Sequence, residues 1–217
     1  MNAGTSYPTG ELEGRTAVVT GSSSGIGRAI ALELAAAGAD VVVHARARRD
    51  AAEETAAQIR RLGRQATAIV ADLAETAGHE PLVEQAWKWR GGVDIWVNNA
   101  GADVLTGPAA GWSFDEKLEH LWRVDVRATV RLSRLVGDRM RRSSGSPPPG
   151  VILNMGWDQA EHGMSGDSGE MFAAVKGAIL AFSRSLAHSL APQAVSTLTT
   201  LASSARISSI SPTSRSC

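Results

Sequence analysis

Short runs of apolar residues alternate along the chain with longer segments in which apolar residues recur every three to four positions. Runs without interspersed polar residues are typical of strands in a parallel sheet, because helices cover both faces of such a sheet. The predicted strands are 17–19, 41–43, 68–70, 95–97 and 151–153, with 195–201 as a candidate sixth. Strand and helix in alternation predict right-handed crossovers and a doubly wound α/β fold, a Rossmann-type parallel sheet between two helical layers.

The longer segments predict helices over about 26–37, 50–62, 79–90, 116–141 and 171–191. In the first helix, Ile26, Ile30 and Leu34 lie four residues apart and are expected to share one apolar face. Gly38 follows as a stop signal. The last helix carries a longer apolar stripe, made of Phe172, Val175, Ile179, Phe182, Leu186 and Leu190.

Composition narrows the class of protein. A chain of 217 residues with 43% hydrophobic and 20% charged residues is expected to fold as one domain rather than to be disordered. Its 22 basic and 22 acidic residues balance, so nothing favours nucleic acid or an anionic membrane as partner. The single cysteine, Cys217, excludes an intramolecular disulfide, and no run reaches the roughly 18 apolar residues of a membrane span. These features indicate a cytoplasmic protein.

The first candidate site is a glycine-rich turn, Thr20-Gly21-Ser22-Ser23-Ser24-Gly25-Ile26-Gly27, between the first strand and the first helix. Glycines let the backbone turn tightly and let a pyrophosphate approach the helix N-terminus, where unpaired N–H groups and the helix dipole favour negative charge. A tight turn needs glycine even without a ligand, but this position between strand and helix favours a dinucleotide site. A second motif, Asn98-Asn99-Ala100-Gly101, follows the fourth strand.

The two motifs at this separation resemble the short-chain dehydrogenase/reductase family, and the resemblance runs from about residue 14 to about residue 192. It implies a nicotinamide dinucleotide over the carboxyl ends of the strands, with three glycines under its phosphates and Asp72-Leu73 beside its adenine. Asp72 could equally cap the helix that follows. The residues that the resemblance assigns to the cofactor are Thr20, Gly21, Ser23, Gly25, Ile26, Gly27, Arg46, Asp72, Leu73, Asn98, Ala100, Gly101 and Lys176.

The choice of dinucleotide depends on the end of the second strand. An NAD site usually has an acidic residue there to hold the ribose hydroxyls, whereas an arginine accommodates the 2′-phosphate of NADP. This chain has Ala45 followed by Arg46, so NADP is favoured over NAD. Arg46, Arg48 and Arg49 could instead be a solvated start to the next helix.

The catalytic positions depart from the family pattern of Asn, Ser, Tyr and Lys. Lys176 is present, but Phe172 stands four residues before it in place of tyrosine. Trp157 or Asp158 stands in place of serine, and Asp125 in place of asparagine. Phenylalanine cannot donate the proton that carbonyl reduction needs, and loss of a general acid costs about 10²–10⁴ in rate. The chain is therefore expected to retain cofactor binding even where catalysis is weak or lost.

A relocated acid is one alternative. The segment 158–170 contains Asp158, Glu161, His162, Asp167 and Glu170, any of which could sit above the cofactor. A solvated polar loop over the substrate cleft is the other interpretation. The spacing of these residues fits no standard set of metal ligands, so no metal is expected.

The ends of the chain set the expected domain boundaries: a flexible tail over 1–13, a dinucleotide-binding domain over 14–201 and a disordered tail over 202–217. All 22 glycines precede residue 178, and 12 of the last 23 residues are serine or threonine. The family's Pro-Gly turn, lid and seventh strand have no counterpart here. A shifted reading frame after about Gln193, or a truncation, is a hypothesis that explains this change of composition.

The resemblance implies NADP-dependent hydride transfer between nicotinamide and a carbonyl or alcohol, weak in this chain. A catalytically dead dinucleotide-binding subunit is the alternative, and a nonfunctional fragment with an open sheet edge is a third. Family members pair the helices corresponding to 116–141 and 171–191 across a twofold axis. A homodimer or homotetramer acting on a small molecule is therefore expected, unless both apolar stripes pack only on the sheet.

Overall fold

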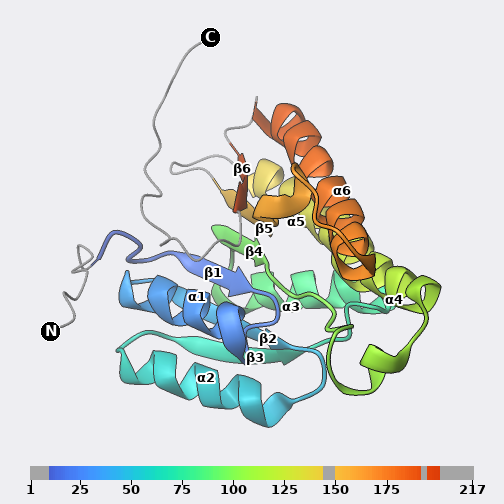
Figure 1. Cartoon of the computed structure of the whole chain (residues 1–217). Coiled ribbons are helices and arrows are strands. Elements are labelled where there is room, and N and C mark those ends of the chain that lie inside the picture. The colour runs from blue at the N-terminus through green and yellow to red at the C-terminus, as the bar shows by residue number, and fades with distance from the viewer. Residues whose placement is uncertain (1–9, 144–149, 192–194, 201–217) are drawn as a thin grey trace, which may run out of the picture.

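The computed structural model describes residues 10–143, 150–191 and 195–200. Within them, six parallel strands form one sheet in the order β3-β2-β1-β4-β5-β6 (Figure 1). The strands are β1 (Thr16–Val19), β2 (Asp40–Ala45), β3 (Ala66–Val70), β4 (Ile95–Asn98), β5 (Val151–Met155) and β6 (Ser196–Thr200). This topology confirms the Rossmann-type prediction and the candidate sixth strand. No strand follows β6 in the described part of the chain, so β6 forms an edge of the sheet.

The helices lie between the strands as predicted. They are α1 (Gly25–Ala36), α2 (Arg49–Arg61), α3 (His79–Arg90), α4 (Phe114–Leu121), α5 (Ala128–Ser143) and α6 (Asp167–Leu190). Four short segments are η1 (Thr76–Gly78), η2 (Gly107–Gly111), η3 (Trp122–Arg127) and η4 (Asp158–Ala160). None of the described helices is long and apolar enough to cross a membrane.

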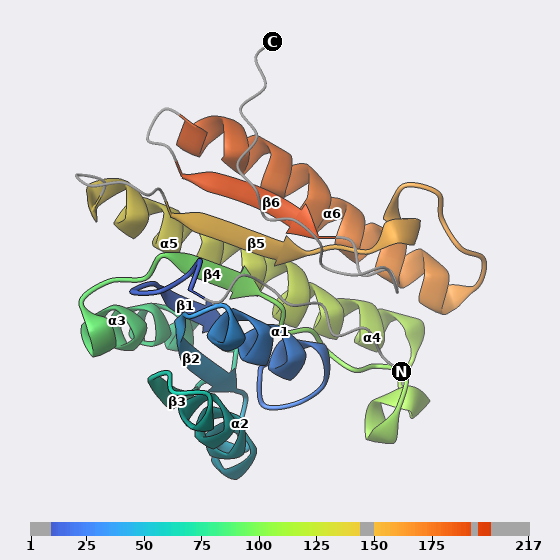
Figure 2. The same cartoon turned by 90° about the vertical axis from the view of Figure 1, so that its left-hand side faces the viewer.

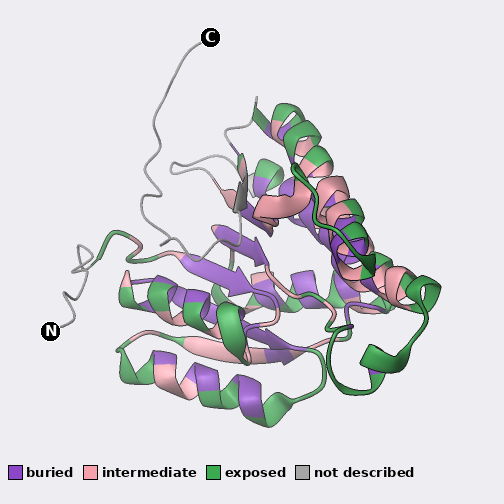
Figure 3. Cartoon of the chain, viewed as in Figure 1, coloured by how far each residue is buried: buried purple, intermediate pink, exposed green. Residues whose placement is uncertain are grey.

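Two hydrophobic layers flank the sheet, because successive strand residues point to opposite faces. Val19, Val41 and Val43 pack against α1 and α2 on one face. Val18 and Val42 pack on the other face, in the cluster that α3 and α5 cover. The central strands are buried throughout, whereas the outer sides of the helices are exposed (Figure 3). Both faces of the central strands are therefore covered, which explains their continuous apolar sequence.

Three helix predictions need correction. The helix expected over 116–141 is interrupted by the π-helical turn η3, which separates α4 from α5. Ile26 does not share the buried face of α1 with Ile30; it lies in the first turn of the helix and is 60% exposed. In α6, Met171 and Ser183 are buried, whereas three members of the expected stripe are only partly buried: Phe172, Phe182 and Leu186.

The last described elements, β5, α6 and β6, pack together at one edge of the sheet. β6 pairs with β5 along its full length, and α6 runs beside both strands (Figure 2). α6 begins at Asp167, so the segment expected as a loop over 158–170 is partly helical. Of the expected tails, 1–9 and 202–217 lie outside the described residues. Residues 10–14 form a turn in which the Leu12 N–H donates to the Ala37 carbonyl at 2.9 Å.

Candidate cofactor site and active site

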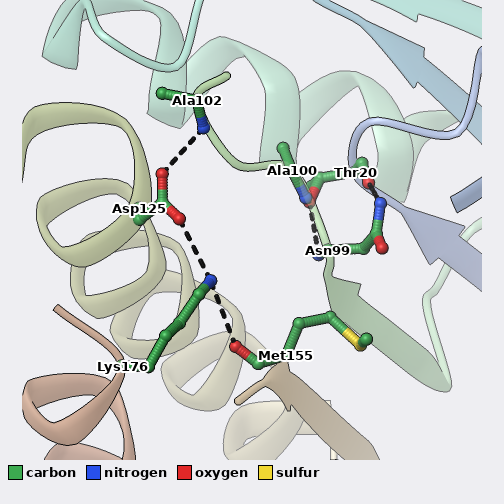
Figure 4. Close-up of polar contacts among 7 residues, drawn as sticks. All are labelled: Thr20, Asn99, Ala100, Ala102, Asp125, Met155 and Lys176. Atoms are coloured by element: carbon green, nitrogen blue, oxygen red, sulfur yellow. Dashed lines mark hydrogen bonds and ion pairs between the residues drawn. The ribbon is translucent and has the colours of Figure 1, made fainter. Parts of the chain in front are cut away.

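The candidate site lies where the sheet reverses its strand order, between the carboxyl ends of β1 and β4. Crevices at this position bind ligands in doubly wound sheets. Buried Thr20 joins the two motifs that end these strands. Its N–H donates to the Val97 carbonyl at 2.9 Å, and its Oγ1 accepts the N–H groups of Asn99 at 2.9 Å and Ala100 at 3.0 Å (Figure 4). The glycine turn and the Asn-Asn-Ala-Gly motif therefore form one polar unit.

Two glycines of the turn are required by close packing. A Cβ on Gly27 would lie 2.3 Å from the Gly21 carbonyl oxygen and 2.4 Å from Asn99 Nδ2. Gly21 has φ of +65°, and a Cβ there would lie 2.9 Å from the Ala100 Cα. Asn99, which the sequence analysis did not assign, donates from Nδ2 to the carbonyls of Thr20 and Gly21 at 2.9 and 3.3 Å. It thus fixes the turn from the β4 side.

The third glycine, Gly25, faces open space instead. It has φ of +56°, and no atom lies within 4 Å of the Cβ position. It opens α1, whose N-cap residue Ser24 makes no capping hydrogen bond and whose first turn contains no acidic residue. Partly buried Ser23 and exposed Ile26 flank this opening. An uncapped helix N-terminus that faces open space suits a phosphate group.

The adenosine end of the predicted site is formed by residues after β2 and β3. Arg46 is exposed, and none of the described residues pairs with it. Asp72 is exposed and accepts the Ala74 N–H at 2.9 Å, so it caps the turn that follows β3. Its predicted adenine contact and this capping role are compatible. Leu73 is buried in the core, so only its backbone is available to a ligand.

Asn98 and Gly101 have roles within the protein. The Asn98 side chain is buried, donating to Ser133 Oγ at 2.9 Å and Asn154 Oδ1 at 2.8 Å while accepting from Trp96 Nε1 at 2.8 Å. These bonds direct the amide into the core, away from the turn that Asn99 contacts. A Cβ on Gly101 would lie 2.9 Å from Asp125 Oδ2, so the loop after β4 passes directly over that carboxylate.

Lys176 and Asp125 form a buried ion pair. Lys176 Nζ on α6 lies 3.0 Å from Asp125 Oδ2 and 3.5 Å from the Met155 carbonyl oxygen (Figure 4). Asp125 Oδ1 accepts the Ala102 N–H at 2.8 Å. The side chains are 2% exposed for Asp125 and 14% for Lys176. Asp125 lies in η3, and such π-helical turns are frequent at functional sites.

The remaining predicted catalytic positions bring two aromatic rings together. The Trp157 and Phe172 rings meet edge to face, with their centroids 6.2 Å apart and an interplanar angle of 65°. Trp157 therefore contacts the side chain that replaces tyrosine. Asp158 begins η4 and is partly buried. Neither ring carries a group that can donate a proton to a carbonyl as a general acid. The pair forms an apolar surface, and Phe172 lies one helical turn before Lys176.

The acidic segment after β5 offers little to this site. Glu161 pairs with Arg184 at 2.6 Å, which directs it to the outer side of α6. His162, Asp167 and Glu170 are exposed. Among the described residues, no group of three or more His, Cys, Asp or Glu side chains could hold a metal ion.

The comparisons with known proteins agree with this geometry. The family model for short chain dehydrogenase matches residues 15–204. The chain belongs to the short-chain dehydrogenase family. A 3beta-hydroxysteroid dehydrogenase 1 of Eggerthella lenta is 37% identical over 150 residues, covering 67% of this chain and 54% of that relative. This short-chain dehydrogenase chain thus spans about half the length of that curated relative.

Solved short-chain dehydrogenases share the fold. One from Burkholderia cenocepacia J2315, in complex with NADP, is 33% identical with a TM-score of 0.73, over 85% of this chain and 71% of that one. A 3-ketoacyl-(acyl-carrier-protein) reductase from Brucella melitensis, complexed with NADH, is 30% identical with a TM-score of 0.76, over 87% and 75%. The structural likeness therefore covers more than four fifths of this chain.

Proposed function

We propose that the chain is an NADP-dependent oxidoreductase that transfers hydride between nicotinamide and a carbonyl or alcohol, with low turnover. The observation that carries this proposal is the open, uncapped N-terminus of α1 at Gly25, on the same edge of the sheet as Arg46, which pairs with none of the described residues. The helix N-terminus supplies N–H groups for a pyrophosphate, and Arg46 supplies a guanidinium for a 2′-phosphate. The NADP bound to the Burkholderia relative supports the assignment.

The chain's own residues have distinct parts in this proposal. Gly21, Gly25 and Gly27 would let the phosphates approach the backbone, and Lys176 would bind the nicotinamide ribose. When bound, the nicotinamide supplies or accepts the hydride. Phe172 has no proton to give to the reduced carbonyl oxygen, and Asp125 neutralises the ammonium beside it. Binding without efficient turnover is what this combination of residues favours.

Cofactor preference gives a direct prediction. NADPH should bind at least tenfold more tightly than NADH, because a charge-assisted contact to the 2′-phosphate contributes about 1.5–3 kcal/mol. Arg46→Ala should remove most of this difference, and isothermal titration of both cofactors measures it. Arg48→Ala is the matched control, since Arg48 is also exposed but lies 3.8 Å from Asp50. Equal affinities in the parent protein would argue against NADP.

Turnover assays test the rest of the proposal. The pure protein is incubated with NADPH and a panel of ketones, and oxidation of the cofactor is followed by its absorbance. Slow turnover supports the enzyme, and binding with no turnover supports a regulatory or structural dinucleotide-binding subunit. Failure to bind either cofactor contradicts both.

We also propose that the protein is a homodimer or homotetramer. Phe182 and Leu186 on α6 are only partly buried, and Trp122 beside α4 is 44% exposed, so both helices retain apolar surface. Light scattering at micromolar concentration should give at least twice the monomer mass. Phe182→Asp should shift the protein toward monomer, whereas Ser185→Asp, an exposed position on the same helix, serves as the charge control. A monomeric parent contradicts the proposal.

A further inference from the structure

His44, near the end of β2, makes side-chain contacts on both sides of its strand. The ring is 1% exposed. Its Nδ1 lies 3.0 Å from the Gly21 nitrogen, and its Nε2 lies 2.9 Å from the Ala71 carbonyl oxygen. A carbonyl can only accept and a backbone N–H can only donate. One arrangement of the neutral ring therefore satisfies both partners, with the proton on Nε2 and the lone pair on Nδ1.

The backbone of His44 joins the same turn. The Ser22 N–H donates to the His44 carbonyl at 2.9 Å, and the His44 N–H donates to Ser22 Oγ at 3.0 Å. Ser22 Oγ in turn donates to the Val19 carbonyl at 2.6 Å. These bonds fix Ser22 regardless of the side chain at position 44. The Gly21 N–H, by contrast, depends on the imidazole as its acceptor.

From these contacts we infer that His44 is a positioning residue for dinucleotide binding. Its Nδ1 sets the direction of the Gly21 peptide, the first glycine under the proposed pyrophosphate. The Ala71 carbonyl acts through the ring, because it holds the tautomer that leaves Nδ1 free to accept. An apolar residue of similar size would fill the space and leave the Gly21 N–H without this partner. The inference rests on the proposed cofactor binding.

The neutral state of the ring is part of this arrangement. Burial lowers the pKa of His44 to about 4, although the Ala71 carbonyl and the Asp72 carboxylate act in the opposite direction. Asp72, which follows β3, is the charged group that acts on the ring. Gly21 and Ser22 on the β1 side carry no charge, and Arg46, two residues after His44, is exposed. A protonated ring has two N–H groups and cannot accept from Gly21. The contribution of His44 to NADPH affinity should therefore be constant well above the lowered pKa and be lost as the pH approaches about 4.

Two amide substitutions separate the functions of the ring nitrogens. Asparagine in His44→Asn places an oxygen near the Nδ1 position and keeps an acceptor for Gly21. Glutamine in His44→Gln places its amide nitrogen near Nε2, which keeps a donor for Ala71 but no acceptor for Gly21. We expect NADPH to bind His44→Asn within about threefold of the parent and His44→Gln at least tenfold more weakly. Thermal unfolding of both variants reports whether the fold is retained.

Measurements without cofactor keep the inference testable on its own. In the free protein, hydrogen exchange of the Gly21 amide should be faster in His44→Gln than in His44→Asn or the parent. Nitrogen-15 chemical shifts of the parent should show Nε2 protonated and Nδ1 unprotonated at neutral pH. Equal loss of affinity in both variants, or the opposite tautomer, overturns the role of His44. Failure of the parent to bind NADPH, with the exchange pattern intact, refutes the proposed function but not the contact.

Discussion

Carbonyl reduction by the variant Asp125→Asn/Trp157→Ser/Phe172→Tyr should exceed that of the parent at least tenfold. Position 172 precedes Lys176 by one helical turn, so a phenol there shares a face with the ammonium. A general acid contributes about 10²–10⁴ in rate, so a tenfold gain allows for imperfect placement. Serine replaces Trp157 because this residue stands in place of the family's serine and its ring packs against residue 172.

The third substitution follows from the ion pair. An ammonium lowers the pKa of a nearby phenol by favouring its charged form. Asp125 Oδ2, 3.0 Å from Lys176 Nζ, offsets that effect with a charge of opposite sign. Asparagine keeps an oxygen for the Ala102 N–H and removes the negative charge. Activity should therefore rise further when Asp125→Asn is added to Trp157→Ser/Phe172→Tyr.

The matched control is Asp125→Asn/Trp157→Ser with Phe172 retained, which should remain at the level of the parent. Initial rates are measured with saturating NADPH and a panel of ketones, at equal NADPH occupancy. Robust turnover by the parent would show that another acid already supplies the proton. A folded, NADPH-binding triple variant without any gain would show that the defect does not lie in these three side chains.

The strands could be predicted because residues buried on both faces of a sheet are continuously apolar, and most helices because one apolar face recurs every three to four residues. This periodicity does not show which turns of a helix are covered by the sheet. Ile26 continues the four-residue spacing of Ile30, yet it lies in the first turn of α1 and is exposed. The π-helical turn could not be predicted from periodicity either, since it inserts one residue into a helix whose apolar spacing already tolerates threes and fours.

The site was predictable at the level of motifs and less so at the level of side chains. Asn98 lies two residues after Trp96 on the same strand, so the alternation of strand residues already indicates that both share a buried face. The same alternation indicates that Asn98 points into the core and that the next residue, Asn99, does not. His44 gave no equivalent signal, because a histidine in an apolar strand is equally consistent with simple core packing. Its role depends on a contact with Gly21, 23 residues earlier in the chain.

Gly27→Ala should abolish dinucleotide binding, lowering NADPH affinity at least a hundredfold. A Cβ at position 27 would lie 2.3 Å from the Gly21 carbonyl oxygen and 2.4 Å from Asn99 Nδ2. The first of these neighbours is backbone, so the turn itself must move. Overpacking of this kind typically costs about 1–3 kcal/mol in the free energy of unfolding. The lesion should therefore be visible without cofactor, as a lower midpoint in urea.

Gly25→Ala provides the contrast, because its Cβ would meet no protein atom within 4 Å. The positive φ of +56° makes alanine unfavourable there by about 1–2 kcal/mol, which sets the upper end of the stability loss. The added methyl group would occupy the space at the N-terminus of α1, so NADPH affinity should fall by more than the stability change explains.

Gly177→Ala, on helix α6 with ordinary φ and open surroundings, is the control for the substitution itself. Alanine there should stabilise the protein by about 0.5–1 kcal/mol, through helix propensity. Normal NADPH binding by Gly25→Ala would mean that the pyrophosphate does not approach α1 at this glycine, and the assignment of the cofactor to the open end of this helix would then be wrong.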